Sequence, residues 1–372
     1  MSISGSAIFS SSAKKNTERI RLSRVDRFLP LLILVAMALG VSLSKLIPQL
    51  ASMLGSLTIQ GTSVPIAIGL LVMMYPPLAK IRYDKLHQSL SDKSMLLASI
   101  ALNWLIGPAV MFSLAWIFLG NQPSYRTGLI LVGLARCIAM VLVWNDLACG
   151  DREGAAILVA LNSLFQVFAY ALLGWFYLME LPKLLGLSQA SMSFSVSSIA
   201  ISVVIFLGIP VVLGYLTRNI GERMKGRNWY EAKLIPKISP FALYGLLFTV
   251  ILLFALQGRH ITAHPLDVVR IAIPLLCYFA IMWSAGLLVG IGLKLPYSKV
   301  VTVAFTAAGN NFELAIAVTI ATFGISSGQA LASVVGPLIE VPALISLVYV
   351  ALALKNRLTW APESRGEVSN NV

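Results

Sequence analysis

Charged side chains are scarce in this sequence. Asp, Glu, Lys and Arg make up only 12% of its 372 residues, whereas soluble proteins carry about 25%. Hydrophobic residues account for 58%, and apolar runs of about 20 residues, the length that spans a bilayer as a helix, recur along the whole chain. This balance excludes water as the main solvent and predicts a single integral membrane domain.

Cysteine and histidine are also rare, with three residues of each. The cysteines, Cys137, Cys149 and Cys277, form no CxxC pair and no Cys/His cluster with the spacing of a zinc site, so neither a disulfide framework nor a structural metal is supported. The sequence also lacks a Walker loop, an HExxH motif, a nucleophile elbow and a Rossmann fingerprint. We therefore expect no cofactor and no enzymatic activity.

The apolar runs define the expected fold class, an all-α integral membrane protein. Residues 28–354 form the membrane domain, between a basic, Ser-rich extension at residues 1–27 and a tail at residues 355–372. Ten transmembrane helices are expected, at residues 28–46, 64–78, 96–119, 127–149, 153–179, 194–216, 240–256, 268–293, 299–323 and 330–354.

The basic residues give the expected orientation. The chain has 28 Lys and Arg residues against 15 Asp and Glu, a net charge of +13. With both termini in the cytoplasm, most basic residues fall on inner segments, which follows the positive-inside rule for an inner or plasma membrane. Because these residues are spread over alternating loops, the charge does not require a nucleic-acid partner. The outer loops hold only Arg126, Lys183, Arg259 and Arg270.

Ten helices divide into two halves of five with opposite orientations, at about residues 28–182 and 194–354, as in inverted-repeat transporters. Helices four and nine then occupy corresponding positions, and both carry polar residues within an apolar span. Gly133 lies shortly before the polar residues of the fourth helix, and Gly309 lies beside those of the ninth. Glycine weakens a helix, so we expect both helices to be broken, with freed backbone groups facing a cavity.

The fourth helix contains the string GLARCIAMVLVWNDLACGD, in which Arg136 adjoins Cys137. A charge within the bilayer is costly and usually functional, and a neighbouring cation favours the thiolate, the form that binds soft metals and metalloids. On a continuous helix, Trp144 and Asn145 return to the face of Cys137 and offer a lid and an amide. Alternatively, Cys137 only packs, and Arg136 snorkels or pairs with a structural acid.

The ninth helix contains TAAGNNFELAIAV, where Asn310, Asn311 and Glu313 interrupt an apolar run. A carboxylate in the middle of a span cannot snorkel to water, and desolvation favours its protonated form. Glu313 is therefore suited to exchange protons near neutral pH, as a proton-coupled carrier requires. We expect the polar groups of helices four and nine to meet in the middle of the membrane.

The tenth helix carries a second intramembrane acid, Glu340, between two prolines in GPLIEVP. Two interpretations have equal support: a proton relay, or a structural group that pairs with Arg136 or with the backbone at a kink. Asp146 and Asn162 are weaker candidates, because Asp146 lies near a helix end and Asn162 can simply bridge two helices.

The strings LARCIAMVLVW, TAAGNNFELAIAV, VVGPLIEVP and PIAIGLLVMMYPPLAK resemble the Acr3 family of arsenite permeases, within the bile-acid/arsenite/riboflavin transporter superfamily. The likeness runs over residues 28–354. It implies efflux of trivalent arsenite, and in some members antimonite, in exchange for protons. At matching positions, the family's essential cysteine is Cys137 and its essential glutamate is Glu313. Further positions linked to function in that family are Arg136, Trp144, Asn162 and Glu340.

Arsenite is a neutral trihydroxy species with a soft arsenic atom, so one thiolate can bind it by displacing a hydroxyl, and weakly enough to release it. We therefore expect Cys137 to be the arsenic(III) ligand. The other candidate site residues are Arg136, Trp144, Asn145, Asn310 and Asn311 for the substrate, Glu313 and Glu340 for protons, and Asn162 and Asp146 in support.

Three other functions compete with this prediction. The nearest is a sodium-coupled symporter of organic anions on the same scaffold. A membrane enzyme with Cys137 as its nucleophile is a second, although no histidine lies near in sequence to serve as a general base. A receptor or assembly factor without transport activity is the third, but this function does not explain why two separate spans carry buried charges.

Overall fold

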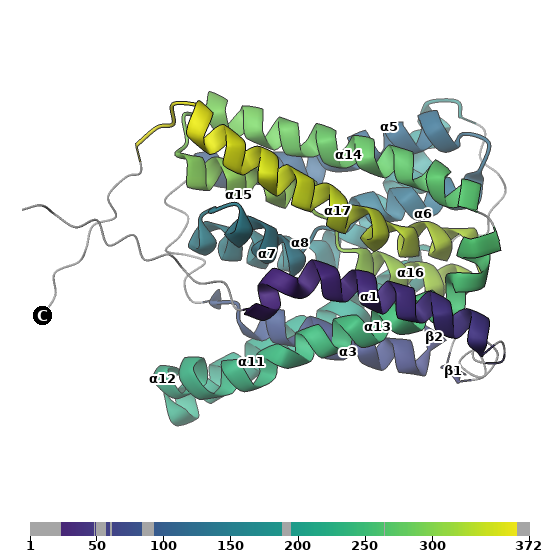
Figure 1. Cartoon of the computed structure of the whole chain (residues 1–372), viewed down its shortest axis with the longest axis horizontal. Helices are drawn as coiled ribbons and strands as arrows, with labels where there is room; N and C mark the ends of the chain where they lie inside the picture. The colour runs from purple at the N-terminus through teal and green to yellow at the C-terminus, as the bar shows by residue number, and fades with distance from the viewer. Residues whose placement is uncertain are drawn as a thin grey trace, which may run out of the picture.

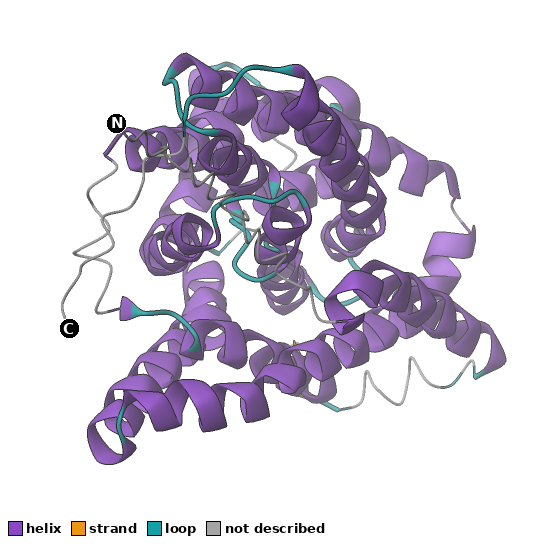
Figure 2. Cartoon of the chain, turned by 60° about the vertical axis from the view of Figure 1, so that its left-hand side comes forward, coloured by secondary structure: helices purple, strands orange, loops and turns teal. Residues whose placement is uncertain are grey.

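The computed structural model describes residues 24–47, 49, 57–59, 62–83, 93–187, 195–263 and 265–362. Residues 1–23 of the predicted extension and residues 363–372 of the predicted tail lie outside this part. Helix α1 begins at Arg24 and α17 ends at Arg357, so the helical part extends slightly beyond residues 28–354 at both ends. Figure 2 shows helix over almost all of the described chain.

Helices make up the fold, apart from two short antiparallel strands, β1 (Thr58–Ile59) and β2 (Thr62–Ser63). The helices are α1 (Arg24–Leu46), α3 (Val64–Ala79), α4 (Lys93–Ala101), α5 (Gly107–Leu119), α6 (Pro123–Leu134), α7 (Met140–Leu147), α8 (Arg152–Trp175), α9 (Leu181–Leu184), α10 (Val196–Val203), α11 (Ile209–Lys225), α12 (Arg227–Trp229), α13 (Ile235–Ala263), α14 (Pro265–Gly292), α15 (Tyr297–Ala308), α16 (Phe312–Phe323) and α17 (Gly328–Arg357).

Short π-helical turns join several of these helices into longer rods. They are η3 (Leu102–Ile106) between α4 and α5, η4 (Phe176–Glu180) between α8 and α9, η5 (Val204–Gly208) between α10 and α11, and η6 (Tyr230–Leu234) between α12 and α13. A π turn widens a helix locally without ending it, and such turns are frequent near functional sites.

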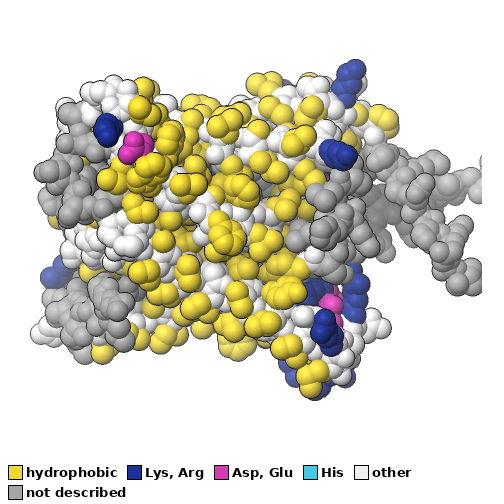
Figure 3. Space-filling model, turned by 180° about the vertical axis from the view of Figure 1, so that it is seen from behind, with side chains coloured by type: hydrophobic (Ala, Val, Ile, Leu, Met, Phe, Trp, Pro, Cys, Tyr) yellow, Lys and Arg dark blue, Asp and Glu magenta, His cyan; other side chains and the backbone are white. Residues whose placement is uncertain are grey.

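Within the described residues, 6 helical segments are long and apolar enough to cross a membrane. Every predicted span overlaps a helix, or, for the fourth and ninth, a pair of short helices. Hydrophobic side chains cover the middle of the face in Figure 3, and Lys and Arg side chains lie toward its ends. The all-helical membrane class is therefore confirmed, whereas ten crossings arranged as an inverted repeat stay a prediction. The 6 segments are Lys93–Leu119, Arg152–Leu184, Val196–Lys225, Arg227–Arg259, Pro265–Gly292 and Gly328–Arg357.

Helix α13 packs against both α1 and α3, and the three helices form one wall of the molecule (Figure 1). Small residues allow the close approach: a Cβ on Gly245 of α13 would lie 2.8 Å from the backbone nitrogen of Met73 in α3. Close packing over small residues is how membrane helices associate when lipid removes the hydrophobic driving force between them. We call these three helices the α1–α3–α13 wall.

Gly336 of α17 provides a test of packing beside the site. A Cβ at this position would overlap the ring of Phe312, which is 1% exposed. We expect Gly336→Ala to displace the ring and destabilise the protein by about 1–3 kcal/mol, the usual cost of overpacking. Thermal unfolding of the detergent-solubilised protein measures this effect.

Gly292→Ala is the matched control, because an added Cβ meets nothing within 4 Å at this exposed helical position. Alanine is a better helix former than glycine, so this variant should melt at or slightly above the wild-type temperature. An unchanged melting temperature for Gly336→Ala would contradict the packing described here.

Candidate functional site

Two interrupted helices meet at the centre of the site. Residues 135–139 separate α6 from α7, and residues 309–311 separate α15 from α16. The interruptions lie side by side, since Arg136 and Asn310 form an antiparallel bridge. The Asn311 N–H donates to the Ala135 carbonyl at 3.0 Å, and the Cys137 N–H donates to the Gly309 carbonyl at 3.3 Å. Both breaks fall in the segments whose glycines and polar residues predicted them.

The two asparagines satisfy backbone groups that the breaks leave unpaired. The Asn310 amide donates to the carbonyls of Val132 at 3.0 Å and Ala135 at 3.2 Å, at the end of α6. The Asn311 side-chain oxygen accepts from the Leu314 N–H at 3.0 Å and caps α16, the role for which asparagine is favoured. Asn310 Oδ1 and Asn311 Nδ2 have no hydrogen-bond partner among the described residues.

Cys137 packs against Gly309, the residue that follows α15. A Cβ on Gly309 would lie 3.0 Å from the Cβ of Cys137, so glycine permits the contact. The Cys137 Sγ accepts the Val141 N–H at 3.3 Å, in the first turn of α7, and the side chain is 4% exposed. The thiol is thus held in place from both interrupted helices.

Arg136 is fully buried and contacts a different set of helices. Its Nη1 donates to the Tyr278 hydroxyl of α14 at 2.9 Å, and its backbone N–H donates to the Gln166 side chain of α8. A Cβ on Gly107 of α5 would lie 2.8 Å from Nη1. No ion pair joins Arg136 to an acid in the described part of the chain, which contradicts the alternative that Glu340 is its partner.

Removal of the Tyr278 hydroxyl tests this arrangement. Tyr278→Phe leaves Nη1 of the buried guanidinium without its acceptor, and a lost hydrogen bond to a buried charge costs about 1–3 kcal/mol. We expect a lower melting temperature in detergent than for the wild type. Tyr349→Phe, at a position that is 70% exposed, is the control and should leave stability unchanged. Equal stability of the two variants would show that the bond contributes nothing.

The remaining predicted residues have structural contacts. Trp144 and Asn145 were expected on the face of Cys137 on a continuous helix, and the break before Met140 removes that basis. Asn145 accepts the Thr302 hydroxyl of α15 at 2.7 Å, and Trp144 is fully buried. The other two candidates bridge neighbouring elements: Asp146 pairs with Arg152 at 2.6 Å, and Asn162 accepts the Trp104 indole N–H at 3.1 Å.

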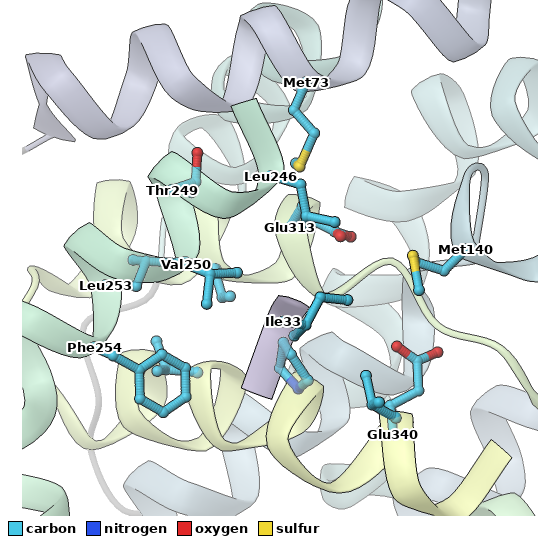
Figure 4. Close-up of a pocket in the computed structure, with 14 residues that line it drawn as sticks. Ile33, Met73, Met140, Leu246, Thr249, Val250, Leu253, Phe254, Glu313 and Glu340 are labelled. Atoms are coloured by element: carbon cyan, nitrogen blue, oxygen red, sulfur yellow. The ribbon is translucent and has the colours of Figure 1, made fainter. Parts of the chain in front are cut away.

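Glu313 and Glu340 line one pocket, between the α1–α3–α13 wall and helices α7, α16 and α17 (Figure 4). Glu313 lies in the first turn of α16 and is half-buried. Glu340 is 4% exposed, accepts the backbone N–H of Asn310, and has an Oε1 without a partner among the described residues. The structure therefore brings the two predicted acids together and joins Glu340 to the crossing.

Cys137 lies beside this pocket and is not part of its lining as described, although Met140, three residues later, is. The crossing links them: the Cys137 N–H donates to the Gly309 carbonyl, and Glu340 accepts the backbone N–H of the next residue, Asn310. One sulfur, from the break before α7, and two carboxyl groups, from α16 and α17, thus lie in one buried region. A soft ligand atom and two carboxyl groups in one buried region suit the binding of a soft, hydroxylated solute.

Sequence reasoning missed three polar residues of the site, Gln166, Tyr278 and Thr302. Each is buried and bonds to a predicted residue: Gln166 and Tyr278 to Arg136, and Thr302 to Asn145. Gln166 had a readable signal, because it interrupts the apolar run of the fifth predicted span. Tyrosine and threonine are common in membrane helices, so their positions alone gave no comparable signal.

The sequence is similar to a known family of transporters and to several of its relatives. Residues 67–264 match the sodium bile acid symporter family. The chain is 55% identical over 347 residues to the arsenical-resistance protein Acr3 of Corynebacterium glutamicum, covering 93% of this chain and 94% of that protein. It is 31% identical over 356 residues to the arsenical-resistance protein Acr3 of Alkaliphilus metalliredigens, with 91% and 94% covered. An uncharacterized transporter of Synechocystis is 35% identical over 361 residues, with 92% and 91% covered.

The long apolar helices, the two crossed interruptions and the buried acids, together with these matches, define a membrane transporter. The chain belongs to the Acr3 family of arsenical-resistance proteins, within the sodium bile acid symporter family.

Proposed function

We propose that this protein is a secondary active transporter that expels arsenite from the cell in exchange for protons. The names of the Acr3 relatives support an arsenical substrate. The observation that carries the proposal is the buried Cys137 thiol at the crossing of two interrupted helices, beside the pocket that Glu313 and Glu340 line. Antimonite shares the trivalent, soft chemistry of arsenite and is a second proposed substrate.

Capture of arsenite at Cys137 is a ligand exchange. The sulfur forms a bond to arsenic, one arsenic–oxygen bond breaks, and the thiol proton leaves with the displaced hydroxide as water. Hydrolysis of the sulfur–arsenic bond reverses the step. Since arsenic then keeps two hydroxyl ligands, the complex is weaker than one with three thiolates, and a carrier must bind its solute weakly enough to release it.

Proton exchange at the two carboxyl groups drives the cycle. Arsenite binds from the cytoplasmic side while Glu313 is deprotonated, and protonation of Glu313 from outside favours release. Glu340 relays the proton, since it lies in the same pocket and contacts the crossing through Asn310.

Alternating access requires relative movement of helices around this site. The pocket lies between the α1–α3–α13 wall and α7, α16 and α17, so we propose that the wall rocks against the helices that carry Cys137, Glu313 and Glu340. Ten membrane crossings in two inverted repeats fit this movement. In this arrangement both termini lie in the cytoplasm, and the protein lies in the inner or plasma membrane.

Everted membrane vesicles from cells that lack their own arsenite pump test the function. Wild-type vesicles should accumulate arsenite when their interior is acidified, because protons then leave as arsenite enters. A protonophore should abolish the accumulation, and expression should restore arsenite resistance to the cells. Arsenite accumulation that is unaffected by the proton gradient would refute antiport. The absence of both accumulation and resistance would refute arsenite transport.

A sodium-coupled symporter of organic anions is the second candidate, because the matched family carries that description. The pocket argues against it: two carboxyl groups line it, and none of its lining residues within the described chain is basic. Uptake of an organic anion driven by a sodium gradient would favour this candidate, and we expect none.

A further inference from the structure

Two methionine side chains lie in the pocket with the acids (Figure 4). Met73 extends from α3 toward Glu313. Met140, at the start of α7, lies on the side of the pocket to which the carboxyl groups of Glu313 and Glu340 point. The other lining side chains are aliphatic or aromatic, apart from Thr249. In the described part of the chain, the two thioether sulfurs are therefore the soft donor atoms of this pocket.

We propose that the thioethers of Met73 and Met140 form a sulfur subsite that trivalent arsenic occupies before it reaches the Cys137 thiol. This inference rests on the proposed arsenite transport and adds a binding step to it. A thioether is neutral and polarisable, and soft centres prefer sulfur to oxygen ligands. No bond to arsenic breaks in this step, and no proton moves.

The surrounding groups match the rest of the substrate. Arsenite presents three hydroxyl groups around arsenic, and the carboxyl oxygens of Glu313 and Glu340 are hydrogen-bond acceptors in the same pocket. The buried Oε1 of Glu340 has no partner among the described residues and needs a donor, since an unpaired buried polar atom is costly. Hydroxyls directed at the acids leave the arsenic atom facing the sulfurs.

The position of the two methionines gives this subsite a role in the transport cycle. Met140 is three residues from Cys137 on the interrupted fourth segment, whereas Met73 belongs to the opposite α1–α3–α13 wall. The backbone of Met73 is fixed in that wall, because Gly245 packs directly against it. Arsenic bound by both sulfurs therefore contacts both groups of helices that must move relative to each other. From this position arsenic can pass to the Cys137 thiol, which lies three residues before Met140.

Methionine is also a common packing residue, and substitution by leucine separates the two roles. Leucine has a similar volume and no sulfur, and a Leu/Met exchange in a core usually costs less than about 1.5 kcal/mol. Met74 is the matched control: it follows Met73 on α3 and is 5% exposed, as Met73 is, but it is not one of the residues that line the pocket.

The experiment is arsenite uptake into everted vesicles by wild type, Met73→Leu, Met140→Leu, the double variant and Met74→Leu, normalised to the amount of transporter. We expect KM to rise roughly threefold in each single variant and roughly tenfold in the double variant, with little change in Vmax, because binding is lost before the rate-limiting movement. Met74→Leu should retain the wild-type KM.

The outcomes separate this subsite from the proposed function. Wild-type vesicles that do not transport arsenite would overturn the proposed function itself. If the wild type transports arsenite and both single variants keep its KM, the sulfur subsite is wrong. An equal rise of KM in Met74→Leu would assign the effect to packing and would likewise overturn it. If the double variant is poorly inserted, the two single variants decide.

Discussion

Cys137→Ser should lower arsenite transport by roughly a hundredfold or more while the protein remains in the membrane, because oxygen is a hard ligand with little affinity for soft arsenic. Serine preserves the shape of the side chain, and its hydroxyl can still accept the Val141 N–H that now points at the sulfur. The fold should therefore survive. Arsenite uptake into everted vesicles, normalised to the transporter present, measures the loss.

The other two cysteines provide controls for this result. Cys149 is exposed beyond the end of α7, and Cys277 is half-buried in α14. Neither lines the pocket as described, so Cys149→Ser and Cys277→Ser should transport arsenite at close to the wild-type rate. Retained transport by Cys137→Ser would remove the thiol from the mechanism, and loss of transport in all three variants would indicate a general effect of thiol removal.

Glu313→Gln should uncouple arsenite movement from the proton gradient. Glutamine keeps the size and hydrogen bonding of a protonated carboxyl group but cannot release a proton. Wild-type uptake into everted vesicles should rise as the interior becomes more acidic, whereas uptake by the variant should be flat with pH and about tenfold slower under a full gradient. Uptake at several imposed pH differences provides the measurement.

Two further substitutions, Glu340→Gln and Glu153→Gln, test whether the uncoupling is specific to Glu313. Glu340 shares the pocket with Glu313, so its substitution should slow transport but retain a pH dependence through Glu313. Glu153 lies exposed in the first turn of α8, and its substitution should change neither rate nor pH dependence. If Glu313→Gln kept the wild-type pH dependence, the coupling role would belong to another group.

The sequence by itself determined the class of protein and the segments that meet at the candidate site. Lipid offers no hydrogen bonds to the backbone, so membrane helices must be long and apolar, and their lengths are readable from composition. For the same reason, a charge or an amide within a span is costly and stands out against its neighbours. Arg136, Glu313 and Glu340 were found in this way, and Cys137 through its neighbour Arg136. The structure places all four in or beside the crossing.

Only the tertiary structure decided how these groups face one another. Arg136 and Cys137 are adjacent in sequence, yet one contacts Tyr278 of α14 and the other Gly309 beside α15. Periodicity could not show this, because the chain is not helical between α6 and α7 and side chains there follow the hydrogen bonds to residues 309–311. The meeting of Glu340 with Asn310, and of Met73 with Glu313, likewise depends on packing between helices far apart in the chain, which no local pattern encodes.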